Sequence, residues 1–240
     1  MADFNMQAIE CPICKTEQTT KIWECVDVTA NEKRKEKLLA DEIFVFKCAK
    51  CGHTVPLVYN CLYVDDDARL MIWMLPEATE KELAEMSEQM NAIKKKDENG
   101  EPYTLRVVSN PNELKEKVII KDAGLDDCMA ELMKMVYLSQ IPAITGDEKL
   151  AEEGISEMYL NLTEDGGYCF TIFFESGREL IIGADREVYD KLVDDFGKLV
   201  EENMDEGFAR IDFEWAKNMF VLKNEEQAKS QKVEEKGSEQ

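Results

Sequence analysis

The sequence predicts a mixed α+β protein. Two C-x-x-C pairs lie among short alternating apolar segments in the first third of the chain, and residues with helical periodicity follow in the middle. Alternating segments joined by glycine-containing turns return near the C-terminal end. At 240 residues the chain is long enough for one large domain or two modest ones with cores of their own. We therefore expect an N-terminal antiparallel β domain, a helical connection, and a small C-terminal antiparallel sheet with packed helices.

The two cysteine pairs predict a metal site in the N-terminal domain. Their four members are Cys11, Cys14, Cys48 and Cys51. Two intervening residues let the backbone curl until both sulfurs face one ion, and two such turns supply the four thiolates of a closed tetrahedral zinc site. Gly52 follows the second pair, where a tight turn favours positive φ, and Lys15 occupies the equivalent position after the first pair. We expect one structural Zn²⁺ per chain.

Two other interpretations of these cysteines are open. An iron tetrathiolate of the rubredoxin kind uses the same four ligands and would make the protein an electron carrier. The stretch Cys11-Pro12-Ile13-Cys14 also resembles a glutaredoxin-type redox motif, which needs a strand before it and a helix after it. Only ten residues precede Cys11, and no amphipathic helix begins at Cys14. Zinc is therefore the favoured interpretation.

The chain is strongly acidic, with 51 Asp and Glu against 29 Lys and Arg and a net charge of −22. Acidic residues also outnumber basic ones within residues 1–80, so the cysteine-bearing part is not a basic patch. Proteins bind phosphate backbones through clustered cations, so we expect no nucleic-acid partner. No signal-peptide pattern and no run of apolar residues long enough for a membrane span is visible. Together with cysteines in metal spacing, this favours the reducing cytoplasm.

Residues 8–76 are expected to form the zinc-ribbon-like domain. Alternating patterns predict strands over 22–29, 43–47, 54–64 and 69–75. Three consecutive aspartates at 65–67 predict the turn between the last two strands. A charged insert at 31–41 is expected to be a solvated turn or short helix, and its basic residues are Lys33, Arg34, Lys35 and Lys37.

Residues 77–141 are expected to form a helical connecting region. Thr79 and Glu82 have the spacing of a capping box, and apolar residues at helical spacing follow them. A short strand is expected at 103–108. Pro111 favours the start of a second helix, and Asp126 is expected to cap a third. The third helix has apolar residues on most sides, which indicates burial between layers. A linker is predicted over 142–154.

Residues 155–223 are expected to form an α+β domain that folds on its own. Its predicted strands are 158–162, 168–174, 179–182 and 210–213. Asp185 is expected to begin an amphipathic helix, and a short helix carrying Trp215 should follow the last strand. Residues 224–240 are rich in Glu, Lys and Gln with almost no apolar side chains, so a disordered tail is predicted there.

Several of these motifs resemble the bacterial CpXC family. They are Cys11-Pro12-x-Cys14, Cys48-x-x-Cys51-Gly52, the stretch from Leu62 to Glu77, Arg106-Val107-Val108-x-Asn110 with Asn112-Glu113-Leu114-x-Glu116-Lys117, and Gly124-Leu125-Asp126-Asp127. The likeness covers roughly residues 8–140. It implies a metal-binding domain of uncharacterised function, in which the four cysteines match the family's cysteine pairs.

No catalytic constellation accompanies the cysteines. The chain has one histidine, and no serine or cysteine is placed beside it as a nucleophile. We therefore expect no enzymatic activity, and a zinc-stabilised cytoplasmic interaction or adaptor protein that binds another protein. The remaining cysteines lie within apolar patterns and are expected to be small buried hydrophobes: Cys25, Cys61, Cys128 and Cys169.

Overall fold

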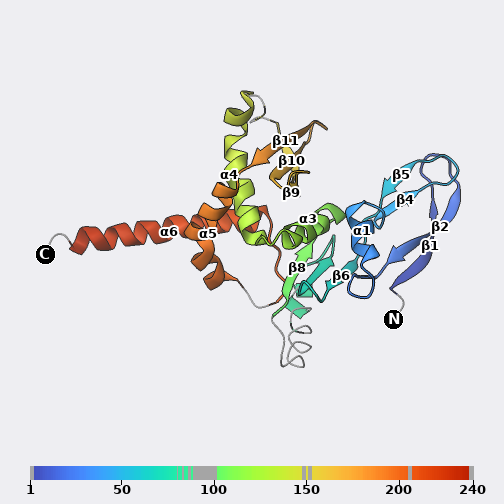
Figure 1. The fold of residues 1–240 in the computed structure, drawn as a ribbon, viewed down its shortest axis with the longest axis horizontal. Helices are drawn as coiled ribbons and strands as arrows, with labels where there is room; N and C mark the ends of the chain where they lie inside the picture. Colours follow the sequence, from blue (N-terminus) through green and yellow to red (C-terminus); the bar gives the residue numbers. More distant parts are fainter. Residues whose placement is uncertain are drawn as a thin grey trace. The chain divides into compact units, whose positions relative to one another are not determined.

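The structure is a computed structural model of the chain and describes residues 3–79, 81, 82, 84, 85, 88, 102–147, 150, 153–204 and 207–237, with side chains to residue 229. Figure 1 shows its elements in chain order. The chain divides into two compact units, one of residues 1–115 with 206–209 and one of residues 116–205 with 210–240. Helices and strands occur in both units, so the predicted α+β class is confirmed.

Two short antiparallel ribbons form the cysteine-bearing part of the first unit. Strand β1 (Phe4–Glu10) pairs with β2 (Glu17–Trp23), and β4 (Val45–Lys47) pairs with β5 (Thr54–Pro56). Each ribbon closes through a turn that holds one C-x-x-C pair. Helix α1 (Lys33–Leu39) lies between the ribbons in sequence, so the charged insert is a short helix, one of its two predicted forms.

A four-stranded sheet completes the first unit, in the order β3 (Cys25–Asp27), β6 (Cys61–Asp65), β7 (Leu70–Met74) and β8 (Thr104–Val108). The central strands β6 and β7 form the predicted hairpin, whereas β3 and β8 join it in parallel, so this sheet is mixed. The single strand predicted at 22–29 is divided between β2 and β3, which lie in different sheets. The apolar alternation continues across the break. The break was not predicted because periodicity does not specify the partner of a strand.

Residues 207–209 return to the first unit beside β8. Ala209 forms an isolated parallel bridge with Arg106, and the Val107 amide donates to the Ala209 carbonyl over 3.0 Å. Phe208 packs with Leu75 and other apolar residues of the sheet. The prediction of a fourth strand at 210–213 is therefore wrong. The only β pairing among the described residues of this segment is the bridge at Ala209, and a helix begins at Phe213.

The second unit contains a three-stranded antiparallel sheet with β10 (Tyr168–Phe174) between β9 (Ile155–Leu162) and β11 (Glu179–Ala184). Helix α3 (Pro111–Asp122) leads into it, and α4 (Asp127–Thr145) contacts both α5 (Arg186–Asn203) and α6 (Phe213–Gly237). The rings of Tyr137 on α4 and Phe170 on β10 lie 5.2 Å apart, and the Asp185 amide donates to the Tyr137 hydroxyl over 2.7 Å. The packing of this sheet therefore includes α4.

The observed boundaries differ from the predicted ones in three places. The region predicted at 77–141 is shared, because β8 belongs to the first unit and α4 to the second, and the predicted 155–223 domain lacks α4. Helix α4 continues three residues past Pro142, where a linker was predicted, because Ile141 is buried and Gly146 closes the helix at φ 68°. Helix α6 reaches Gly237 instead of ending in a disordered tail.

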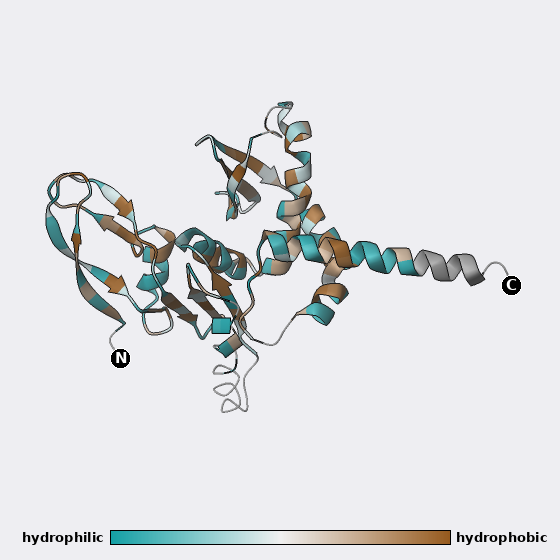
Figure 2. Ribbon diagram, turned by 180° about the vertical axis from the view of Figure 1, so that it is seen from behind, coloured by the Kyte–Doolittle hydropathy of each residue, from teal (hydrophilic) through white to brown (hydrophobic). Residues whose placement is uncertain are grey.

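The polar end of α6 explains that last difference. The segment after residue 222 is rich in Glu, Lys and Gln, and the part of it that Figure 2 colours by hydropathy is mostly teal. These residues are good helix formers even where no apolar face is buried. The disordered tail was predicted from the low content of apolar residues, which does not take helix propensity into account. Across the described part of the chain, no helix combines the length and the apolar character that crossing a membrane requires.

Candidate metal centre

The turns that carry the two cysteine pairs have the same backbone hydrogen bonds. In the first turn, the Cys11 amide donates to the Thr16 carbonyl over 3.0 Å, and the Lys15 amide donates to the Cys11 carbonyl over 2.9 Å. In the second, the Cys48 amide donates to the carbonyl of His53 and the Gly52 amide to the carbonyl of Cys48, both over 2.8 Å. Corresponding residues thus make corresponding bonds. The two cysteine pairs therefore lie in turns of the same backbone geometry.

The residue after each pair adopts a left-handed backbone. Gly52 has φ 73°, as its position predicted, and Lys15 has φ 56°. A residue with a Cβ atom adopts this conformation at a cost of about 1–2 kcal/mol. The first turn therefore forms with a lysine where glycine would be unstrained, and the surrounding contacts hold it there.

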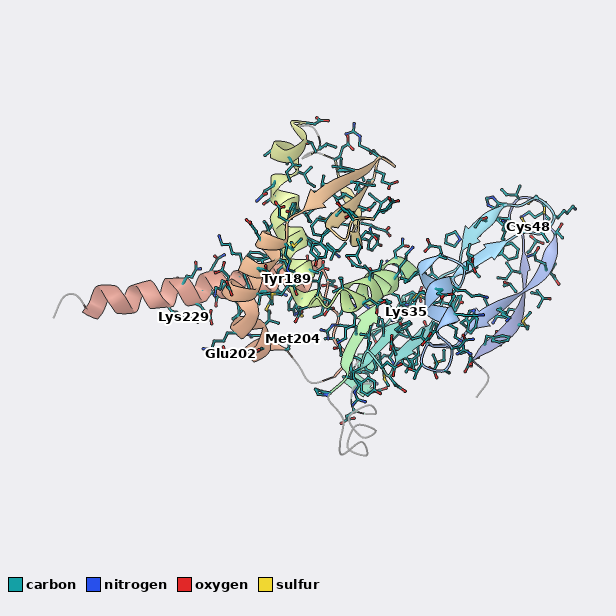
Figure 3. The ribbon with its side chains drawn as sticks, in the orientation of Figure 1. Lys35, Cys48, Tyr189, Glu202, Met204 and Lys229 are labelled. Atoms are coloured by element: carbon teal, nitrogen blue, oxygen red, sulfur yellow. The ribbon has the colours of Figure 1, made fainter. Side chains whose placement is uncertain are left out.

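The structure brings the four predicted ligands together. The sulfurs of Cys11, Cys14, Cys48 and Cys51 all lie within 4.8 Å of one another. Cys11 Sγ is 3.6 Å from Cys51 Sγ, and Cys14 Sγ is 3.5 Å from Cys48 Sγ, so each short contact joins one turn to the other. Four thiolates about 2.3 Å from a tetrahedral ion would be roughly 3.8 Å apart. The spacing of these sulfurs therefore suits a tetrahedral metal ion. Figure 3 labels Cys48, beyond the end of β4.

Little apolar surface supports this end of the ribbons. Its buried cluster consists of Cys11, Phe46 and Cys48, with half-buried side chains such as Val55 and Leu57 packed against it. Two of its three members are cysteines of the site, and Cys51 is exposed. A cluster of this size buries too little apolar area to hold two ribbons together by itself.

The four thiols differ in acidity. Hydrogen bonding with the side chain and the backbone of Thr16 lowers the pKa of Cys14 to about 6. A hydrogen bond from the backbone of His53 favours the Cys51 thiolate, but desolvation and hydrogen bonding to the neighbouring thiols outweigh it and raise the pKa of Cys51 to about 12. One thiolate is thus available near neutral pH, and the neighbouring protons must leave when a metal binds.

A second group of possible ligand atoms has a structural explanation. Asp126, Asp127 and Cys128 lie within 4.8 Å of one another at the start of α4. Asp126 Oδ1 accepts from the Cys128 amide over 2.7 Å, which is the predicted helix cap, and Asp127 Oδ2 lies 3.0 Å from Lys117 Nζ. Cys61 and Cys128 are buried, as predicted, and Cys25 and Cys169 are half-buried.

The second unit contains a buried ionic cluster that the sequence did not predict. Its members are Glu116, Lys117, Asp127, Glu131 and Lys134. Lys134 Nζ is 2.8 Å from one carboxylate oxygen of Glu116 and 2.8 Å from one of Glu131. The other Glu116 oxygen accepts from the Leu160 amide, which joins α3 to β9. A prediction from sequence usually assigns charged residues to the surface, because the sequence pattern does not distinguish a buried charged residue from an exposed one.

Comparison with known proteins identifies the family. A family model of the CpXC protein matches residues 9–134, which is more than half of the chain and includes both cysteine pairs. Neither the curated protein sequences nor the solved structures gave a match. The match agrees with the motifs at Cys11-Pro12-x-Cys14 and Cys48-x-x-Cys51. The chain belongs to the CpXC family.

Proposed function

We propose that the protein is a zinc-stabilised interaction or adaptor protein of the cytoplasm, without enzymatic activity of its own. The observation that carries this proposal is the convergence of four sulfurs from two equivalent turns within 4.8 Å. Thiolates in this number and geometry suit a structural zinc ion. The metal would join the β1–β2 ribbon to the β4–β5 ribbon and fix the surface that they present.

The ligand set argues for a structural rather than a catalytic ion. A catalytic zinc keeps one position open for water or substrate, and four protein thiolates fill a tetrahedral shell. The four residues that would hold the ion are Cys11, Cys14, Cys48 and Cys51. When bound, Zn²⁺ would neutralise part of the negative charge of the thiolates and act as a cross-link between distant residues.

A nucleic-acid partner receives no support from the predicted basic cluster. Arg34 Nη2 lies 2.5 Å from Asp3 Oδ2, and Lys35 Nζ lies 2.8 Å from Asp65 Oδ2. Two of the four basic residues in this cluster are therefore already engaged in ion pairs within the protein. At a net charge of −22 we expect no useful affinity for duplex DNA at physiological salt. A salt-sensitive gel shift at sub-micromolar protein would contradict this expectation.

Metal analysis of anaerobically purified protein tests the proposed ion. We expect one zinc per chain and a colourless solution. Iron in place of zinc, with a visible thiolate-to-iron absorption, would overturn the proposal and support electron transfer. Metal-dependent turnover of any substrate would overturn the non-enzymatic assignment. Affinity capture from the native cell, with zinc-loaded protein and the Cys48→Ser variant in parallel, tests whether partner binding requires the metal-fixed ribbons.

A further inference from the structure

A cavity in the first unit lies apart from the cysteines. Its volume is about 570 Å³, and it is lined by Val58, Tyr59, Asn60, Leu75, Pro76, Glu77, Ala78, Glu82 and Glu85. We refer to it as the 58–85 pocket. It lies between the segment that precedes β6 and the segment that follows β7. Its volume is in the range of sites for organic ligands and is far larger than a bare ion needs.

One part of the 58–85 pocket is apolar and firmly held. Leu75 belongs to the buried cluster of Leu105, Val107 and Phe208, and Ala78 packs against the same cluster. Tyr59 is fixed from two sides, because its ring lies 5.4 Å from that of Phe44 and its hydroxyl accepts from the Trp23 amide over 3.2 Å. Val58, by contrast, is 51% exposed. The pocket thus offers an uncovered apolar side chain on a rigid support.

The other part of the pocket is anionic. Glu77, Glu82 and Glu85 contribute three carboxyl groups, and none of the described residues that line the pocket is a lysine or arginine. Glu82 Oε2 accepts from the Thr79 amide and hydroxyl, both over 2.8 Å, which completes the predicted capping box. These bonds lower the pKa of Glu82, so its charge persists at neutral pH. Lys81 Nζ lies 3.7 Å from Glu85 Oε1, and Lys81 is not part of the lining.

We propose that the 58–85 pocket binds a basic segment of a protein partner. Lysine and arginine combine an apolar stem with a cationic head, so one such side chain matches both parts of the pocket. The stem would lie on Val58 and Leu75, and the head would meet Glu77 and Glu85, with arginine able to form paired hydrogen bonds to a carboxylate. An aliphatic neighbour in the same segment fills the remaining volume. This inference is independent of the proposed zinc function, because no residue of the pocket is a metal ligand.

The test uses the full, zinc-loaded chain and two capped, fluorescently labelled peptides. One peptide alternates leucine with arginine, and the other alternates leucine with glutamate. We expect saturable binding of the basic peptide alone by fluorescence anisotropy, with amide NMR shifts concentrated at residues 58–60 and 75–78. The double variant Glu77→Gln with Glu85→Gln should weaken binding about tenfold, because two charge-assisted contacts are lost. Val58→Ser should weaken it several-fold.

A matched control separates the pocket from general acidity. The double variant Glu42→Gln with Glu88→Gln removes the same charge from glutamates outside the pocket and should bind like the parent. Equal loss in both double variants, equal binding of the acidic peptide, or no binding up to millimolar peptide would overturn the proposal. Calcium alone producing the same NMR shifts would identify a cation site instead. Binding that Val58→Ser leaves unchanged would contradict the apolar contact.

Discussion

The cysteine site of the first unit and the ionic cluster of the second gather ionisable groups with opposite chemistry. Four thiols converge at the ends of two ribbons, and as thiolates they would form a concentration of negative charge. In the second unit, three carboxyl groups are buried together with Lys117 and Lys134, which supply positive charge from the same chain. The first arrangement can accept a metal cation from outside the chain, and the second contains its own cations.

The two arrangements indicate which part of the protein depends on an ion from its surroundings. Buried charges are tolerated when they are paired or coordinate a metal. The ribbons should therefore be ordered only as far as metal is supplied, whereas the second unit should fold from its sequence alone. Five variants, in order of decreasing effect, test this contrast.

The Cys48→Ser variant should have the largest effect. It removes one ligand, and apparent zinc-binding energies of about 10–16 kcal/mol are comparable to whole-domain stabilities of about 5–15 kcal/mol. We expect loss of stoichiometric zinc and rapid proteolysis of the ribbons within residues 4–57. A resistant fragment that includes α4 and residues 155–223 should remain. Cys169→Ser, a half-buried cysteine outside the site, is the control and should retain zinc. Full zinc in Cys48→Ser, or equally fast digestion of α4, would refute the contrast.

The Lys134→Met variant should destabilise the second unit without affecting the metal. Lys134 lies 2.8 Å from both Glu116 and Glu131, and its side chain is only 8% exposed. Although burial opposes the charged form, these two carboxylates raise the pKa of Lys134. Removing the lysine leaves buried carboxylates unpaired, which typically costs about 3–5 kcal/mol. Hydrogen exchange of the α4 amides should accelerate accordingly. Lys198→Met, on an exposed side chain, should leave exchange unchanged, and zinc content should be normal in both variants.

The Glu131→Gln variant should have a smaller effect that depends on pH. Burial raises the pKa of Glu131 against the opposing effect of Lys134 and Lys117, so its carboxylate is less favoured in the folded state than in the unfolded chain. A raised pKa of this kind contributes stability at low pH that is lost as the pH rises through the folded value. Glutamine keeps an oxygen acceptor for Lys134 and carries no charge. We expect a change within about 1 kcal/mol, with the variant gaining on the parent as the pH rises above the usual glutamate range. An opposite trend in α4 exchange would show that Glu131 is stabilised as a carboxylate.

The smallest effect should come from the two equivalent turns. Lys15→Gly relieves the strain of φ 56° but gains freedom in the unfolded chain, so we expect stabilisation of roughly 0.5 kcal/mol. Gly52→Ala should act in the opposite direction by about 1 kcal/mol. A Cβ atom added at Gly52 meets nothing within 4 Å, so only the backbone conformation is affected. Thermal melting of the zinc-loaded protein measures both. A lower melting temperature for Lys15→Gly would mean that the lysine side chain stabilises the turn.

The local features of this protein could be predicted from its sequence. They include the two cysteine turns, the positive φ of Gly52, the helix cap at Asp126, the helix start at Asp185, and the meander of β9, β10 and β11. Each of these follows from residues a few positions apart, because turn geometry, caps and periodicity depend on short-range hydrogen bonds and on alternation.

The pairing of distant elements is visible only in the tertiary structure. It placed β8 and Ala209 in the sheet of the first unit, included α4 in the packing of the second, and buried Lys134 between Glu116 and Glu131. Strand partners and buried ion pairs join residues far apart in sequence, and alternation or charge has the same local pattern whichever partner is chosen. The cysteines were the exception. The spacing of the cysteines predicts a shared metal site, so the proximity of residues 11 and 48 could be predicted from the sequence.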